Sequence, residues 1–192
     1  MTSRLSPYQA FIALGSSIGS LLEKKLMIEG AIRLLQSVGQ VRYTSAFYLN
    51  YPVGGVAENR FLNGALVLAT ALKPHQLLCE LLNFEAKLGR VRQVPNEDRL
   101  IDLDILFVLH QSKTELKPLQ IKTEHLIVPH GKLTERAFMW WPFIEVLAPL
   151  STITPLGHEA QLMLDQLTQE AGAHALADQD CWYQKVVRVS HG

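Results

Sequence analysis

Cysteine is scarce in this chain, net charge is absent, and no apolar run is long. The two cysteines, Cys79 and Cys181, lie far apart and form neither a metal-binding nor a redox motif, so a reducing cytoplasm is the expected location. Eighteen basic and eighteen acidic residues cancel. This balance disfavours nucleic acid and anionic membranes as partners, because both usually attract a surface with a basic excess.

The hydrophobic pattern leads us to expect neither a targeting nor a membrane-spanning segment. Residues 1–10 contain no apolar run long enough for a secretory signal. The most hydrophobic later stretch, residues 137–150, is interrupted by Pro142, Glu145 and Pro149 and is too short to span a bilayer. With 48% hydrophobic residues, the chain can bury a core. We expect a single domain over residues 1–192, with a C-terminal extension from about residue 158 and no obligate protein partner.

The common nucleotide-binding and hydrolase motifs are absent as well. Residues 15–20 (Gly-Ser-Ser-Ile-Gly-Ser) lack both the Gly-Lys-Ser/Thr ending of a P-loop and the three glycines of the dinucleotide fingerprint. No Gly-x-Ser-x-Gly elbow is present. If the protein uses ATP, it must hold the nucleotide with residues scattered along the chain.

The hydrophobic pattern predicts strands interleaved with helices. Alternating or dense apolar residues predict strands over 11–14, 41–49, 61–70 and 101–109, and a short one over 124–129. Helical spacing and capping residues predict helices from Ser20 to a cap at Gly39, from Pro74 to Gly89, over 142–147, and from 157 to 170. Residues 50–59 and 111–122 are expected to be loops or turns. The combination predicts an α+β fold, with helices covering a sheet.

Asp102 and Asp104 are the most informative residues. Side chains two apart on a strand point to the same face, so both carboxylates should project together while Leu103 faces the core. Such a pair disfavours its own ionisation unless a cation lies between the two groups. A hard cation such as Mg²⁺ suits oxygen ligands at this spacing. The alternative is the solvated outer face of an edge strand.

Charged residues around this strand favour the metal site. Arg90 and Arg99 belong to the loop that leads into it, and guanidinium groups bind phosphate oxygens well. Glu85 falls on the apolar stripe of its predicted helix, where it could orient a substrate or a guanidinium, or simply reach water or pair with Arg90. His130 follows the short strand predicted over 124–129 and could donate a hydrogen bond to a phosphate, or be a structural residue.

Seven short segments between Phe11 and about Pro149 contain these residues and their neighbours in a fixed order. They are Ile12-Ala13-Leu14-Gly15-Ser16, Ser45-Ala46-Phe47-Tyr48, Phe61-Leu62-Asn63-Gly64-Ala65, Gly89-Arg90-Val91-Arg92, Arg99-Leu100-Ile101-Asp102-Leu103-Asp104-Ile105, Val128-Pro129-His130 and Arg136-Ala137-Phe138-Met139-Trp140-Trp141-Pro142. In this order and spacing they resemble the 6-hydroxymethyl-7,8-dihydropterin pyrophosphokinases of folate synthesis.

The resemblance implies a ferredoxin-like α+β fold and transfer of pyrophosphate from ATP to the pterin hydroxymethyl oxygen, which releases AMP. ATP would be the co-substrate and two Mg²⁺ ions the cofactors. The implied catalytic residues are Arg90, Arg99, Asp102 and Asp104, the two aspartates being the metal ligands. The implied ATP-binding residues are Glu85, Arg92, His130 and Arg136. The implied pterin-binding residues are Asn50, Val53, Phe61, Asn63 and Phe138.

The sequence departs from the family pattern near the expected phosphate site. Glu97 and Asp98 precede Arg99 where a small pair is usual, Gln93 replaces a common lysine, and Ser17 replaces a usual asparagine. Because this catalysis rests on positioning and charge neutralisation, we expect slower transfer or weaker ATP binding. Two alternatives stay open: a pyrophosphokinase of the same fold with another alcohol substrate, and a non-catalytic relative that binds pterin or nucleotide.

Overall fold

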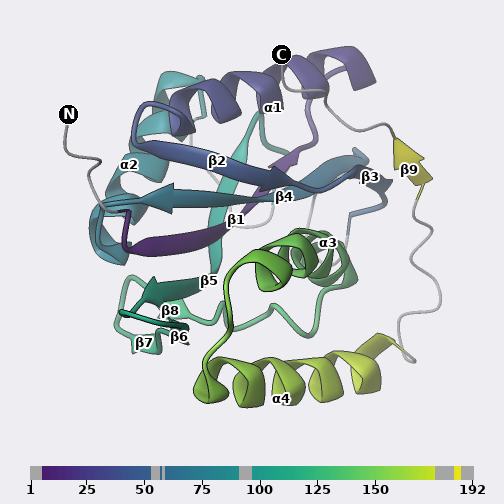
Figure 1. The fold of residues 1–192 in the computed structure, drawn as a ribbon. Coiled ribbons are helices and arrows are strands. Elements are labelled where there is room, and N and C mark those ends of the chain that lie inside the picture. Colours follow the sequence, from purple (N-terminus) through teal and green to yellow (C-terminus); the bar gives the residue numbers. More distant parts are fainter. Residues whose placement is uncertain (1–5, 53–56, 58, 91–96, 176–183, 187–192) are drawn as a thin grey trace.

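A central sheet organises the part of the chain that the computed structural model describes, residues 6–52, 57, 59–90, 97–175 and 184–186. It has seven strands (Figure 1). They are β1 (Tyr8–Ser16), β2 (Gly39–Thr44), β3 (Phe47–Asn50), β4 (Phe61–Thr70), β5 (Asp102–Gln111), β6 (Leu116–Pro118) and β9 (Gln184–Val186). Two short strands, β7 (Ile121–Lys122) and β8 (Ile127–Val128), pair separately.

Every strand pair in the large sheet is antiparallel, in the order β6-β5-β1-β4-β3-β9. Strand β2 pairs with β4 on the same edge as β3, so β2 and β3 act as two halves of one strand. With α1 (Leu21–Leu35) and α2 (Pro74–Lys87), the chain order becomes strand, helix, strand, strand, helix, strand. This order is that of ferredoxin-like folds, and the predicted α+β class is confirmed.

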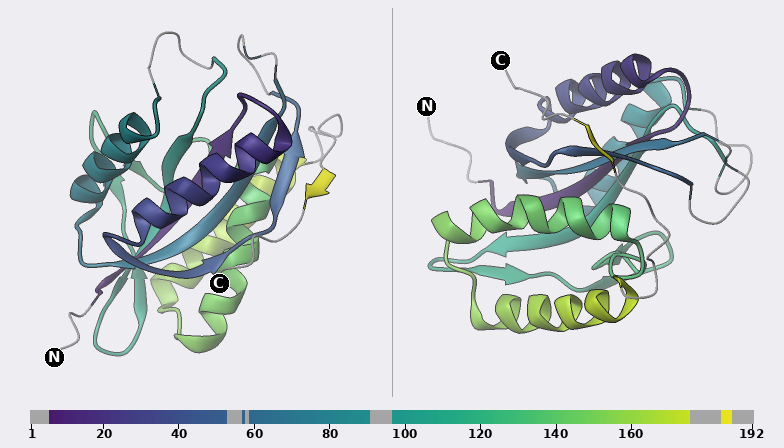
Figure 2. Two further views of the ribbon diagram at one scale, coloured as in Figure 1. Left: turned by 90° about the horizontal axis from the view of Figure 1, so that it is seen from above. Right: turned by 90° about the vertical axis from the view of Figure 1, so that its right-hand side faces the viewer.

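Helices cover both faces of the sheet and create two hydrophobic cores (Figure 2). Helices α1 and α2 bury Ile28, Leu35 and Leu81 against one face. Helix α3 (Ala137–Ile153) lies across β4 and β1 on the other face, where Phe143 packs against Phe11 at a ring separation of 5.2 Å. Helix α4 (His158–Ala175) packs against α3 and β6.

A β-bulge divides β5 into two halves. Phe11 of β1 pairs with Phe107, whereas its neighbour Ile12 pairs with Ile105, so Leu106 is an extra residue. The core under α1 and α2 receives Leu103, Ile105 and Val108, and the core under α3 and α4 receives Leu106, Phe107 and Leu109. The prediction of an unbroken alternation over 101–109 is therefore wrong beyond Ile105, because a bulge reverses the side to which later residues point.

The predicted strand over 41–49 is also interrupted. It breaks between β2 and β3 at Ser45, whose Oγ accepts a hydrogen bond from the backbone N–H of Ala65 at 2.9 Å. Gly39 does not cap the first helix as expected, because α1 ends at Leu35 and Gly39 begins β2. A Cβ at Gly39 would lie 2.5 Å from the carbonyl oxygen of Ala69, so glycine is needed there for close packing.

Three predictions near the C-terminus need adjustment. The segment 111–122 contains β6 and β7 and is not only turns. The helix expected over 142–147 extends over Ala137–Ile153 and includes both Pro142 and Pro149, because its apolar side chains pack along the sheet. The extension from about residue 158 forms α4 and then β9, which pairs with β3. No helix in the described part combines the length and apolar character needed to cross a membrane.

Candidate active site

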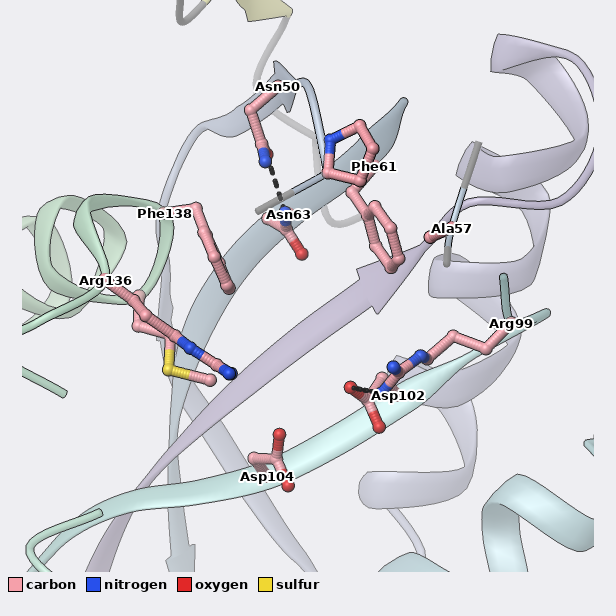
Figure 3. A pocket seen from close by; sticks show the side chains of 11 residues that line it. Asn50, Ala57, Phe61, Asn63, Arg99, Asp102, Asp104, Arg136 and Phe138 are labelled. Atoms are coloured by element: carbon pink, nitrogen blue, oxygen red, sulfur yellow. Dashed lines mark hydrogen bonds and ion pairs between the residues drawn. The ribbon is translucent and has the colours of Figure 1, made fainter. Parts of the chain in front are cut away.

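Asp102 and Asp104 lie at the start of β5, on the face of the sheet that α3 also covers, and the first turn of α3 lies across the pocket from them. In register across three strands, Asp102 pairs with Gly15, which pairs with Asn63. Two residues further along, on the same face, Asp104 pairs with Ala13. Small residues on β1 therefore leave open space between the carboxylates and the amide. The prediction that both carboxylates share one face is confirmed (Figure 3).

Two arginines hold Asp102. Its Oδ1 accepts a hydrogen bond from Nη1 of Arg90 at 2.5 Å, and its Oδ2 accepts one from Nη1 of Arg99 at 2.6 Å. Arg99 is fixed through its backbone, because its N–H donates to Ser17 Oγ at 2.9 Å and its carbonyl accepts from the N–H of Ser17 at 2.9 Å. The guanidinium groups expected near the carboxylates are thus in contact with one of them.

Glu85 stands behind this group and is 2% exposed. Its Oε1 accepts hydrogen bonds from Nη1 of Arg90 at 2.5 Å and from the backbone N–H of Leu103 at 2.8 Å. The second bond satisfies a donor on the edge of β5, between the two aspartates. Glu85 therefore pairs with Arg90, which is one of the alternatives expected from its place on the apolar stripe, and it also anchors the strand through Leu103.

Asp104 is in a less favourable electrostatic environment. Burial raises its pKa to about 7, with further increases from the charges of Asp102 and Glu85, while Arg90 and Arg99 oppose the shift. Within the described residues, no side chain donates a hydrogen bond to this carboxylate. A carboxylate held so close to other acids, and without a donor of its own, is suited to binding a cation.

A pocket of about 100 Å³ opens beside the carboxylates and is lined by Asp102, Asp104, Arg99, Asn63, Phe61 and Phe138. The rings of Phe61 and Phe138 flank Asn63, and the aspartates lie on the opposite wall (Figure 3). Two aromatic rings with an amide between them suit a flat heterocycle that carries hydrogen-bonding edges. The residues predicted for pterin binding are brought together here, except Val53, which lies outside the described residues.

Asn50 fixes the orientation of the Asn63 amide. The Nδ2 of Asn50 donates to the carbonyl of Tyr51 at 2.9 Å, so its Oδ1 is available to accept from Nδ2 of Asn63 at 2.6 Å. Because a backbone carbonyl can only accept, these two bonds define which way both amides face. The oxygen of Asn63 then points toward the centre of the pocket (Figure 3).

Glu145 ties α3 to β3 behind this pocket. Its Oε2 accepts hydrogen bonds from the Tyr48 hydroxyl at 2.8 Å and from the N–H of Ala46 at 3.1 Å. Burial, together with the hydrogen bond to Glu145, raises the pKa of Tyr48 to about 12. The tie connects the strand that carries Asn50 with the helix that carries Phe138, so both walls of the pocket have a common support.

A second, larger cavity of about 600 Å³ adjoins the first, and Asp104 and Arg136 line both. His130 and Lys132 also border it. His130 is anchored by its backbone N–H, which donates to the carbonyl of Leu106 at 2.8 Å. Burial and the charge of Arg136 lower the pKa of His130. The predicted nucleotide-side residues His130 and Arg136 thus meet at one cavity, while Arg92 lies outside the described residues.

Sequence reasoning missed several residues that build the site. Met139 and Ala57 line the smaller pocket, and Gly15 lies between Asn63 and Asp102, where a Cβ would lie 2.6 Å from Oδ1 of Asn63. Ser17 was noted only as a departure from the family pattern, yet its hydroxyl accepts a hydrogen bond from the backbone N–H of Arg99. Apolar and small residues carry no chemical signature of their own, so these roles follow only from the folded arrangement.

Comparison with known proteins points to one family. A family model described as "7,8-dihydro-6-hydroxymethylpterin-pyrophosphokinase (HPPK)" matches residues 11–148. The 2-amino-4-hydroxy-6-hydroxymethyldihydropteridine pyrophosphokinase of Methylorubrum extorquens is 37% identical over 149 residues, which cover 77% of this chain and 83% of that protein. The enzyme of the same name from Bacillus subtilis is 37% identical over 139 residues, 71% of this chain and 77% of that protein.

Solved structures agree on the fold. The crystal structure of a Plasmodium falciparum HPPK-DHPS triple mutant superposes with a TM-score of 0.57 at 13% identity, over 90% of this chain. This chain spans 44% of that longer chain. At such low identity the likeness concerns the architecture of the chain alone.

Proposed function

Because the chain belongs to the 7,8-dihydro-6-hydroxymethylpterin-pyrophosphokinase family, we propose that it transfers pyrophosphate from ATP to the hydroxymethyl group of 6-hydroxymethyl-7,8-dihydropterin at the Asp102–Asp104 face. One observation carries the proposal. Both carboxylates line the cavity that holds the aromatic rings and amides, and Asp104 also lines the adjoining cavity that holds His130 and Arg136. Two arginines contact one of these carboxylates.

The donor set fits Mg²⁺ bound together with a polyphosphate. The described residues hold no group of three or more His, Cys, Asp or Glu side chains arranged around a metal. Two carboxylates alone are nevertheless typical for Mg²⁺, which usually keeps water and phosphate oxygens in its remaining positions. Asp102 and Asp104 would hold the metal, and two bound ions would supply charge neutralisation for the triphosphate. The raised pKa of Asp104 supports this assignment.

Arg90 and Arg99 exchange partners when the nucleotide binds. In the structure both donate to Asp102, which neutralises that carboxylate. Phosphate oxygens offer the guanidinium groups a stronger, bidentate alternative. The arginines then turn to the triphosphate and free Asp102 for the metal, while Glu85 retains its hold on Arg90. In this scheme Glu85 supports nucleotide binding through Arg90, and His130, Arg136 and Arg92 bind the nucleotide directly.

The reaction needs positioning more than it needs a reactive side chain. A bond forms between the hydroxymethyl oxygen and the β-phosphorus of ATP, the hydroxyl loses its proton, and the bond from that phosphorus to the α,β-bridging oxygen breaks, so that AMP leaves. Asn63, Asn50, Phe61 and Phe138 orient the pterin from one side, with Val53 predicted to join them. Such orientation, with arginines near the phosphates, supplies most of the rate enhancement for this class of transfer.

The decisive experiment is AMP release from Mg-ATP with and without 6-hydroxymethyl-7,8-dihydropterin. We expect AMP only when both the pterin and Mg²⁺ are present, and Asp102→Asn should reduce its formation by about 100-fold or more while the variant stays folded. AMP formed only with a different alcohol would establish the altered-substrate alternative. Saturable pterin binding without AMP would establish the non-catalytic alternative and overturn the proposal.

A further inference from the structure

Lys24 is a buried lysine that none of the roles above uses. It lies in the first turn of α1 and is 6% exposed. Its Nζ donates a hydrogen bond to the backbone carbonyl of Arg60 at 2.8 Å. Burying an ammonium group is unfavourable unless acceptors or opposite charges compensate. The buried position of Lys24 therefore indicates that its ammonium group holds the backbone at residue 60 in place.

Asp98 approaches the same point from the loop before β5. It accepts hydrogen bonds from Asn59, through the backbone N–H at 3.3 Å and through Nδ2 at 2.8 Å. Burial lowers the pKa of Lys24, and the negative charge of Asp98 opposes that shift, which places the two charges within electrostatic range. Residues 59 and 60 are thus held by an acid on one side and a base on the other.

Both anchoring points lie one residue from the active site. Arg60 precedes Phe61, which lines the smaller pocket, and Asp98 precedes Arg99, which contacts Asp102. The guanidinium carbon of Arg99 lies 5.9 Å from the centre of the Phe61 ring. A displacement at residues 59–60 would therefore move a wall of the pterin pocket relative to the arginine at the carboxylates.

We propose that Lys24, Asn59 and Asp98 form a positioning junction that sets the pterin-side wall at Phe61 against Arg99. The inference rests on the proposed function and assigns these three side chains to pterin binding, although none of them lines the pocket. It also gives Asp98 a role of its own: its carboxylate is directed to Asn59, so the acidic residue before Arg99 serves the pterin side of the site.

The first test compares Lys24→Met with Lys25→Met. Methionine keeps the unbranched apolar stem of lysine and removes the ammonium group, and Lys25 is an exposed neighbour whose Nζ lies 3.8 Å from Glu29. We expect Lys24→Met to raise the KM for the pterin about tenfold and to leave the KM for Mg-ATP within about twofold. Lys25→Met should change neither constant. An unchanged pterin KM in folded Lys24→Met, or an equal rise in both constants, would overturn the inference.

The second test uses the exposed Asn59 and the half-buried Asp98, both in loops, so it stays informative if Lys24→Met fails to fold. Asn59→Asp places a like charge beside Asp98 and should raise the pterin KM about five- to tenfold. The double variant Asn59→Asp with Asp98→Asn restores a donor–acceptor pair with the roles reversed, and should recover most of the loss. A double variant as impaired as the single one would contradict the junction.

Wild-type activity separates the two levels of proposal. If the wild-type protein releases no AMP with the pterin, the proposed function fails, and the junction, which rests on it, fails with it. If the wild type is active and the Lys24 and Asn59 variants behave like it, the proposed function stands and the junction alone is wrong.

Discussion

Asp104 shows at the scale of one residue how binding and stability compete. Its carboxylate is close to Asp102 and Glu85, and its pKa in the folded protein is about 7. In the unfolded chain the pKa of an aspartate is about 4. The folded state therefore binds the proton more tightly. The corresponding stability is fully present below about pH 4 and is lost as the pH rises through 7.

Asp104→Asn should consequently stabilise the protein without ligands at alkaline pH and abolish its activity. At pH 8 we expect a gain of about 1–2 kcal/mol in the free energy of unfolding, discounted for partial solvent screening. At pH 4 the gain should largely vanish, because the folded wild-type carboxyl is then protonated and the unfolded one has reached its own pKa. Thermal unfolding at both pH values measures this, with Asp165→Asn on the exposed surface of α4 as the control. Equal shifts at the two pH values would refute the assignment.

Glu85 differs from Asp104 because its buried carboxylate accepts hydrogen bonds from Arg90 and from the backbone of Leu103. Glu85→Gln keeps an acceptor for the N–H of Leu103 but removes the charge that faces Arg90. We expect a loss of stability of about 1–3 kcal/mol, because a buried guanidinium loses one of its partners. kcat/KM for Mg-ATP should fall about 10- to 100-fold, since Arg90 is no longer held in place.

Titration calorimetry with a non-hydrolysable ATP analogue checks the binding part of that prediction. Glu29→Gln, on α1 and far from the phosphate side, serves as the matched control and should bind the analogue like the wild type. Wild-type affinity in Glu85→Gln would show that Arg90 needs no partner behind it.

At the scale of elements, strand β1 leaves room for the site because its residues opposite the aspartates have small side chains. Gly15 lies between Asn63 and Asp102, and a methyl group there would meet Oδ1 of Asn63 at 2.6 Å. Because Asn50 holds that amide, the amide has little freedom to move away. Gly15→Ala should raise the KM for the pterin about tenfold with little change in the KM for Mg-ATP. Gly172→Ala in α4, where nothing lies within 4 Å, should leave both constants unchanged.

Periodicity in the sequence predicted the elements that form the centre of the fold. The alternation around Leu103 correctly placed both aspartates on one face, because that argument needs only local geometry. The split after Thr44 and the bulge at Leu106 depend on how β4 and β1 pair with these strands, and such non-local pairing leaves no trace in a single segment. Helix α3 extended through Pro142 for the same reason, since packing on the sheet outweighed local propensity.

From residue chemistry alone, only the charged members of the site were predictable, whereas the uncharged pocket residues followed from the family resemblance. Asp102, Arg90 and Arg99 stood out as residue types with a chemical task, and the structure brings them into contact. The contacts that fix Arg99 through Ser17, and those that join Asn59 to Asp98, link segments distant in the sequence. The predicted pocket and nucleotide roles of the remaining residues await the kinetic tests.

At the scale of the whole molecule, the C-terminal segment returns to the active-site side of the sheet. Strand β9 pairs with β3 (Figure 1), so Leu49 faces Gln184 one position before Asn50. The family model ends at residue 148, before α4 and β9 begin. The extension therefore adds a neighbour to the strand that orients the Asn63 amide.

Removing residues 176–192 should weaken pterin binding more than ATP binding. We expect the pterin KM to rise about three- to fivefold and the melting temperature to fall by about 2–4 °C, because β3 loses its outer hydrogen-bonding partner. Removal of residues 187–192 alone, which leaves β9 in place, is the control and should have no effect on either constant. Equal behaviour of the two truncations would exclude a contribution of β9.

The bulge at Leu106 gives one core two consecutive side chains from the same strand. Before it, the even-numbered positions 102 and 104 face the side of α3; after it, the odd-numbered positions 107 and 109 do, and Leu106 faces that side as well. Deleting Leu106 would leave a regular alternation in which both aspartates and Phe107 keep their present side and β5 keeps its pairing with β1. The deletion would remove one apolar side chain and a local bend. The surplus residue is thus an addition to the core beneath α3 and not a condition for the two acids to share a face.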